Sequence, residues 1–206
     1  MLDAHQYGAF LLAALVLAVL PGPGLLYVLA RSLGGGRRDG VQSSFGTLVG
    51  GMFHVFASAA GLSTLILASS LAFSLVKYAG AAYLIYLGVR TLLSKERLSL
   101  DVNGGPRPNH AFRQGVITEL LNPKTALFFL AFVPQFVNPE AGGVFWQFVL
   151  LGTTSVVLNT LADLLVAAFA GPLGSRLRLN ARFQRGQRVA SGGAMIALGT
   201  YAAVDR

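Results

Sequence analysis

The sequence predicts an all-α integral membrane protein with six transmembrane helices, and three observations lead to this prediction. First, 54% of the 206 residues are hydrophobic and only 12% are charged, whereas soluble domains carry about a quarter charged residues. Second, several apolar stretches reach the roughly 20 residues that a helix needs to cross about 30 Å of hydrocarbon. Third, the basic residues concentrate in alternate connections between those stretches.

The first half of the chain contains three predicted spans. Residues 6–30 carry no formal charge, and residues 41–68 hold His54 as their one ionisable side chain. Residues 71–93 carry a basic residue toward each end. No Lys or Arg precedes the first apolar run, so it lacks the positive region of a signal peptide and we expect it to be retained.

The second half repeats this count. We expect spans at residues 115–137, 144–170 and 189–204, and a cytoplasmic linker at residues 94–112, where a Gly-Gly-Pro-Arg-Pro run opposes both helix and strand. Because each half holds an odd number of spans, the halves would lie in opposite orientations if they are structural repeats. The sequence therefore predicts two inverted three-helix repeats, 1–93 and 113–206.

The distribution of charge predicts the orientation. Thirteen of the 16 Lys and Arg residues fall in the connections after the first, third and fifth spans. Under the positive-inside rule those connections are cytoplasmic, and both termini are external. This also accounts for the net charge of +8 without nucleic acid, and the basic segment after the fifth span is suited to contact anionic lipid.

Two of the predicted spans are interrupted at similar depth. Pro21-Gly22-Pro23-Gly24 breaks the first, and Asn122-Pro123-Lys124 breaks the fourth. Backbone groups left unpaired at that depth are tolerated where they meet protein or line a watery cavity. Matched breaks in corresponding spans are typical of a transporter binding site, although prolines that only kink packed helices are the alternative.

Several motifs, in order along most of the chain, carry a family resemblance. They are Leu20-Pro21-Gly22-Pro23, Gly46-x-x-x-Gly50-x-x-x-His54, the run from Gly80 to Gly88, Phe112-Arg113-Gln114-Gly115, Leu121-Asn122-Pro123-Lys124 and Phe132-Val133-Pro134-Gln135-Phe136. Together they resemble the LysE/RhtB family of bacterial amino-acid exporters. The resemblance implies an inner-membrane secondary exporter of amino acids or related metabolites, driven by the proton gradient. The chain departs from the family pattern at Glu119, where Asn is expected, and at Gly51, where an acidic residue often stands.

Charged side chains inside a span are costly and usually face a cavity or the bundle interior. The predicted spans contain two acidic residues, Glu119 and Asp163, and we expect them to bind a substrate ammonium or a coupling proton. Lys124 would bind a substrate carboxylate, neutralise one acid, or form a permanent structural ion pair. The candidates for proton coupling are Glu119, Asp163 and His54. The candidates for substrate binding are Pro21, Gly22, Pro23, Gly24, Asn122, Pro123, Lys124 and Asn159.

His54 also belongs to a stripe of small residues. Gly46, Gly50, His54 and Ser58 recur every four residues, so they share one face of the second span. The leading interpretation is close helix packing, either within one chain or between copies in a homo-oligomer. A direct role of His54 in proton or substrate binding is the alternative.

Other functions have less support from the sequence. It contains no cysteine, no zinc-protease or nucleophile-elbow motif and no phosphate-binding Gly-Lys loop, so we expect neither an enzyme nor a cofactor or metal. The alternatives are a non-transporting membrane assembly subunit, a channel, and an intramembrane enzyme in which Glu119 and Asp163 share a proton.

Overall fold

The computed structural model describes residues 4–93, 110–178 and 181–204, and over these ranges it is helical and contains no β-strand. This confirms the all-α prediction. The elements are α1 (Ala4–Val19), α2 (Pro23–Ala68), α3 (Ser70–Leu93), α4 (Ala111–Leu120), α5 (Pro123–Leu127), the π-helical turn η1 (Phe128–Phe132), the 3₁₀ turns η2 (Val133–Phe136) and η3 (Pro139–Ala141), α6 (Val144–Arg178) and α7 (Ala181–Val204).

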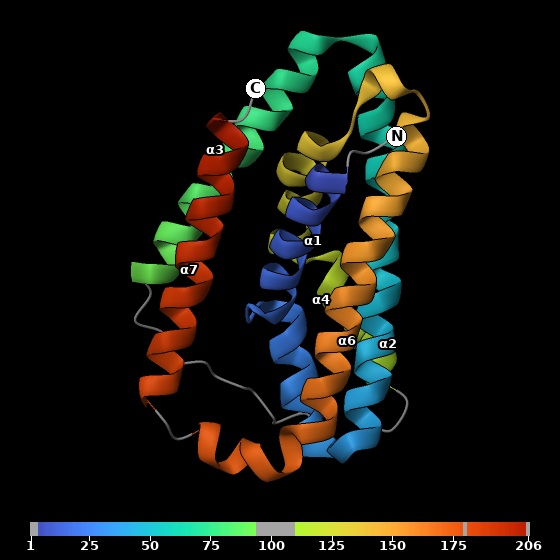
Figure 1. The fold of residues 1–206 in the computed structure, drawn as a ribbon. Helices are drawn as coiled ribbons and strands as arrows, with labels where there is room; N and C mark the ends of the chain where they lie inside the picture. Colours follow the sequence, from blue (N-terminus) through green and yellow to red (C-terminus); the bar gives the residue numbers. More distant parts are fainter. Residues whose placement is uncertain (1–3, 94–109, 179–180, 205–206) are drawn as a thin grey trace.

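Helix α2 consists of two arms that meet at Gly36. This glycine has φ of 77°, a conformation that L side chains rarely adopt, and the chain reverses direction there (Figure 1). We call residues 23–35 the first arm and residues 37–68 the second arm. The charge pattern indicated a connection after residue 30. In the structure this connection is a sharp turn at Gly36 with helix on both sides.

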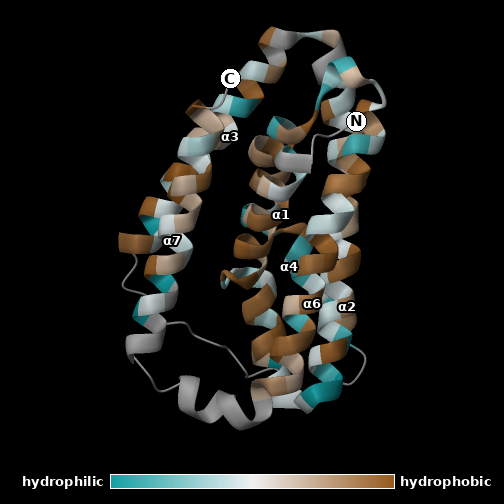
Figure 2. Cartoon of the chain, viewed as in Figure 1, coloured by the Kyte–Doolittle hydropathy of each residue, from teal (hydrophilic) through white to brown (hydrophobic). Residues whose placement is uncertain are grey.

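The two ends of the molecule differ in what they contain. Ala4 and Val204, at the outer ends of α1 and α7, lie at one end together with η3, and the Gly36 turn lies at the opposite end (Figure 1). Hydrophilic residues gather at the Gly36 turn, whereas long apolar stretches run along the middle of the helices (Figure 2). We call these the termini end and the Gly36 end.

A central group of helices holds the two breaks. The second arm of α2 packs against α4 and α6, α1 packs against α6, and α3 and α7 form a pair beside this group (Figure 1). Close approach depends on glycine: a Cβ added to Gly46 would stand 2.2 Å from the Phe112 carbonyl oxygen, and one on Gly115 would stand 2.7 Å from the Ser43 carbonyl oxygen. The stripe of small residues is therefore a packing face within one chain, as its leading interpretation held.

The surface is that of a membrane protein. Large apolar side chains along the middle of the helices are exposed, among them Leu12 (65%) and Leu165 (60%), a pattern that soluble monomers rarely show. Two described helical segments are long and apolar enough to span a membrane, Pro23–Leu65 and Val144–Ala170, and the pair Ala111–Leu120 and Pro123–Phe136, bent by 43°, qualifies as a third if it is one span. Gln6–Val19 is a shorter apolar helix.

The element bounds differ from the predicted spans at a few places. Residues 115–137 are divided among four short elements, α6 continues past residue 170 to Arg178, and α7 begins at Ala181 rather than residue 189. Most of the predicted linker 94–112 lies outside the described residues. Its last two residues belong to α4, which begins at Ala111, a fully buried residue.

Candidate functional site

The two breaks face one another across a small polar cavity. The cavity has about 30 Å³ of free space, and a buried water needs about 10–15 Å³, so in this conformation it has room for one or two water molecules. It lies among α1, both arms of α2, α4, α5, η1 and α6. The lining residues that the sequence singled out are Gly22, Gly24, Glu119, Asn122, Lys124, Asn159 and Asp163.

The second break places the Glu119 carboxylate. Helix α4 ends at Leu120, and Asn122 caps α5, because its Oδ1 accepts a hydrogen bond of 3.1 Å from the backbone N–H of Lys124. The Asn122 Nδ2 donates to Glu119 Oε2 at 3.0 Å, and the Thr125 hydroxyl donates to Glu119 Oε1 at 2.5 Å. Both carboxylate oxygens of Glu119 are therefore held by residues of the break itself.

The same carboxylate also reaches the start of α2. A Cβ added to Gly24 would stand 2.4 Å from Glu119 Oε2. Gly24 lies in the first turn of α2, where backbone N–H groups carry partial positive charge. The absence of a side chain at residue 24 thus lets an acid from the second break approach the helix that follows the first break.

Carbonyl groups at the first break receive donors from distant side chains. The Lys124 Nζ donates to the carbonyl oxygens of Leu17 and Leu20, at 3.0 Å each. The Ser191 hydroxyl of α7 donates to the carbonyl oxygen of Pro21 at 2.9 Å. The break is thereby tied both to the second break and to the α3–α7 pair.

Asp163 is the other acid in the cavity. It is 5% exposed, and its Oδ2 accepts a hydrogen bond of 2.8 Å from the Thr47 hydroxyl across the α2–α6 interface. Asn159, one turn away on α6, donates from Nδ2 to the Ser155 carbonyl oxygen at 2.9 Å. Sequence reasoning missed Thr47, because a threonine beside Gly46 reads as one more small packing residue.

His54 contacts α4 and η1 outside the cavity lining. Its Nε2 lies 3.0 Å from the Glu119 carbonyl oxygen, and its ring stacks on Phe129 with centroids 6.2 Å apart. It is absent from the residues that line the cavity, as are the three prolines at 21, 23 and 123. In this conformation His54 joins α2 to α4 through the backbone.

The charges in the cavity do not pair directly. No ion pair within 4 Å joins Lys124 to Glu119 or Asp163, and the Lys124 ammonium group donates to backbone carbonyls instead, so a permanent Lys124–acid pair is not formed in this conformation. Glu119 and Asp163 each accept from their own threonine, and no hydrogen bond joins the two carboxyls in the described part of the chain. The geometry is therefore not that of an acid dyad that shares one proton. Two acids and one lysine suit a ligand that carries an ammonium group.

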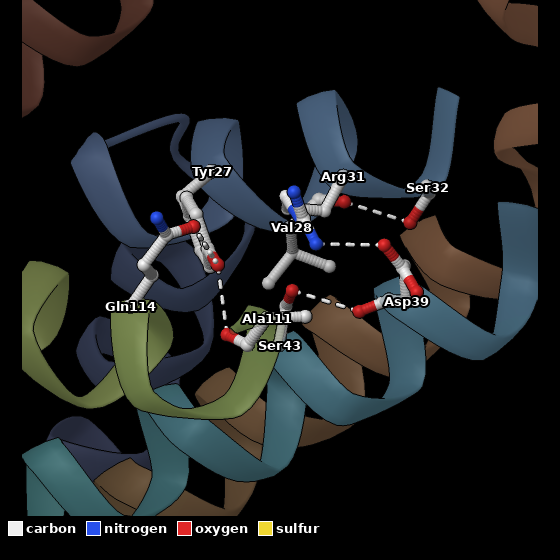
Figure 3. Close-up of polar contacts among 8 residues, drawn as sticks. All are labelled: Tyr27, Val28, Arg31, Ser32, Asp39, Ser43, Ala111 and Gln114. Atoms are coloured by element: carbon white, nitrogen blue, oxygen red, sulfur yellow. Dashed lines mark hydrogen bonds and ion pairs between the residues drawn. The ribbon is translucent and has the colours of Figure 1, made fainter. Parts of the chain in front are cut away.

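Polar contacts join the first arm of α2 to α4 and to the second arm toward the Gly36 end (Figure 3). The Tyr27 hydroxyl donates to the Ala111 carbonyl oxygen at 2.7 Å and joins the first arm to the start of α4. One turn further on, Arg31 and Asp39 form their ion pair of 2.7 Å across the turn. Toward the termini end the enclosure is apolar and aromatic, with Phe10, Phe128, Phe132 and Phe136 packed together.

Broken helices that meet at a polar cavity inside an apolar helical protein are typical of membrane transporters. The family described as LysE type translocator matches residues 15–206, and the chain belongs to that family. This confirms the resemblance found in the sequence motifs.

The chain is also similar to named proteins. It is 34% identical over 159 residues to the leucine efflux proteins of Salmonella typhimurium and Salmonella typhi, which covers 75% of this chain and 74% of each relative. It is 32% identical over 179 residues to an uncharacterized membrane protein of Vibrio cholerae, with 86% of both chains covered. No solved structure matches.

Proposed function

We propose that the protein is a secondary transporter that exports amino acids across the bacterial inner membrane by proton antiport. The observation that carries the proposal is the meeting of two helix breaks at one buried cavity that holds Glu119, Lys124 and Asp163. Membership of the LysE type translocators and the similarity to leucine efflux proteins support the same class of substrate.

The groups that line the cavity are suited to a neutral aliphatic amino acid, which its 30 Å³ of free space would admit only after the surrounding helices move apart. Asp163 and Glu119 offer oxygens to the substrate ammonium, and the first turn of α2 offers backbone N–H groups to the carboxylate. Lys124 adds positive charge on that side of the cavity. Leu17, Leu25, Phe128, Phe129 and Val156 supply the apolar lining that a leucine-like side chain requires.

The transport cycle that we propose is alternating access with six spans in two inverted repeats. Span counterparts pack against each other, the second arm of α2 on α6 and α3 on α7, which supports a two-fold relation between the halves. The polar contacts at the Gly36 end would open to the cytoplasm and the aromatic cluster to the outside. Glu119 and Asp163, with His54 behind Glu119, would exchange protons for substrate, so that the proton gradient drives export.

Efflux from preloaded cells tests the proposal. Cells loaded with a panel of radiolabelled amino acids are compared for the wild type, Asp163→Asn and Glu140→Gln at matched expression, with and without a collapsed proton gradient. Glu140→Gln is the control, because Glu140 is an exposed acid at η3, away from the cavity. We expect saturable efflux of neutral aliphatic amino acids, and Asp163→Asn and collapse of the gradient should each reduce its rate by about tenfold.

Two results would contradict the proposal. Efflux of no amino acid by the wild type would remove the substrate class. Efflux that is unaffected by both treatments would remove proton coupling.

A further inference from the structure

The first break leaves helix carbonyls that the backbone cannot satisfy. In an α-helix the carbonyl of residue 17 accepts from the N–H of residue 21, and here residue 21 is a proline, which has no N–H. Leu20 lies in the break itself, after α1 ends at Val19. Both carbonyls are inside the protein at the depth of the cavity, where an unpaired acceptor is destabilising.

Lys124 supplies the missing donors from the other half of the chain. Its side chain is 6% exposed and its ammonium group donates to both carbonyls at 3.0 Å. Gly22 makes room for it, because a Cβ at residue 22 would stand 3.0–3.2 Å from the last three atoms of the lysine side chain. The positive charge also lies at the carboxyl end of α1, where a helix carries partial negative charge.

We infer that Lys124 is a positioning residue whose ammonium group replaces the N–H that Pro21 removes, and that it shapes the cavity by fixing the end of α1 rather than by binding the substrate carboxylate. The inference rests on the proposed function only where it treats the cavity as a substrate site. The contact between Lys124 and the two carbonyls does not depend on that function. The two motifs that carry the breaks then act as one unit: Asn122 holds the Lys124 backbone at 3.1 Å, and the lysine side chain completes the other break.

A ligand role for Lys124 would carry a structural cost. If the ammonium group turned to a substrate carboxylate, the Leu17 and Leu20 carbonyls would lose their donor inside the bundle. The carboxylate could instead bind at the first turn of α2, where the backbone N–H groups of a helix have no intrahelical acceptor.

The test removes the lysine donor and restores the backbone N–H at residue 21. Lys124→Met keeps the length of the side chain and removes the donor, and Pro21→Ala returns a backbone N–H to residue 21. The wild type, both single variants, the double variant and Lys124→Arg are purified in detergent for thermal unfolding, and reconstituted in liposomes for KM and maximal rate of leucine counterflow.

We expect Lys124→Met to lower the melting temperature and the maximal rate, with KM within about twofold of the wild type, since it removes a positioning contact rather than substrate binding. Adding Pro21→Ala should restore at least half of both losses, and Lys124→Arg should retain most of the wild-type values because it also donates to carbonyls. Pro21→Ala should not rescue Gly46→Ala, which is destabilised at a different contact.

A direct ligand role predicts the opposite pattern. A KM raised about tenfold or more in Lys124→Met, an unchanged melting temperature and no rescue by Pro21→Ala would overturn the inference. If Lys124→Met is not recovered from membranes while the double variant is, the rescue itself supports it. The melting temperatures need no transport, so they decide the inference even if the wild type exports no amino acid and the proposed function fails.

Discussion

At the residue scale, the two acids of the cavity depend on threonine hydroxyls. Thr47→Val keeps the shape of the side chain but leaves Asp163 Oδ2 without the donor that lies at 2.8 Å. We expect a loss of about 1–3 kcal/mol in the free energy of unfolding, because a buried acceptor is left unpaired. Thr47→Ser keeps the hydroxyl and should lose less than half as much, measured by chemical denaturation in detergent.

The comparison also checks the assignment of the contact. A larger loss in Thr47→Ser than in Thr47→Val would mean that the threonine methyl group, and not its hydroxyl, is what the α2–α6 interface needs. Glu119 offers a parallel, since Thr125 donates to it in the same way.

Residues of the candidate site could be predicted from the sequence where a charged side chain stands inside an apolar stretch. A carboxyl or an ammonium group within an apolar stretch is costly, and this was enough to select Glu119, Lys124 and Asp163. Thr47 gave no such signal, because a threonine can satisfy its hydroxyl on a carbonyl of its own helix, and the Thr47 hydroxyl also lies 2.9 Å from the Ser44 carbonyl oxygen. The partners of Lys124 lie more than 100 residues away in the chain, and no local spacing specifies them.

At the scale of the elements, α2 and α4 approach closely at a pair of glycines. Gly46→Ala places a Cβ 2.2 Å from a backbone oxygen of α4, so one helix must shift, and we expect a loss of about 1–3 kcal/mol or more from overpacking. Gly61→Ala is the matched control on the same helix, because a Cβ there meets nothing within 4 Å. It should be neutral or stabilise by up to about 1 kcal/mol, since alanine favours helix.

Thermal unfolding of both variants in detergent measures the difference. A Gly46→Ala variant as stable as Gly61→Ala would contradict the close contact between α2 and α4.

The elements were predictable to different degrees for a physical reason. Proline removes a donor wherever it occurs, so both breaks could be located from the sequence, and the structure ends α1 and α4 close to them. The turn at Gly36 was not located, because a run of glycines and arginines is equally compatible with a longer loop. Helix α4 begins at Ala111, four residues before the predicted span 115–137, and Ala111 is fully buried although no apolar run marks it in the sequence.

At the scale of the whole molecule, the charge asymmetry between the two ends predicts its orientation in the membrane. The chain has no cysteine, so single cysteines can be introduced without background labelling. Glu140→Cys lies at the termini end and Arg38→Cys beside the Gly36 turn, and both positions are exposed. We expect a membrane-impermeant maleimide to label residue 140 in intact cells and residue 38 only after the membrane is opened.

Ser43→Cys is the control, because residue 43 is fully buried and should react poorly in both preparations. The reverse labelling pattern would place the Gly36 end outside and would also reverse the direction of opening in the proposed cycle. The orientation could be predicted from the sequence alone, because the positive-inside rule uses the position of charges along the chain and not their contacts.

The hydrogen bonds of Lys124 to the end of α1 constrain the order in which residues 21 and 124 can be substituted during evolution. A lysine that completes a helix interrupted by Pro21 is needed only while that proline is present, and the proline is tolerated only while the lysine is present. The proline can therefore change first, whereas a change of the lysine while the proline is present passes through a less stable intermediate. Among descendants of this chain, substitutions at residue 124 should therefore be found where residue 21 has also changed, although 103 positions separate them in the chain.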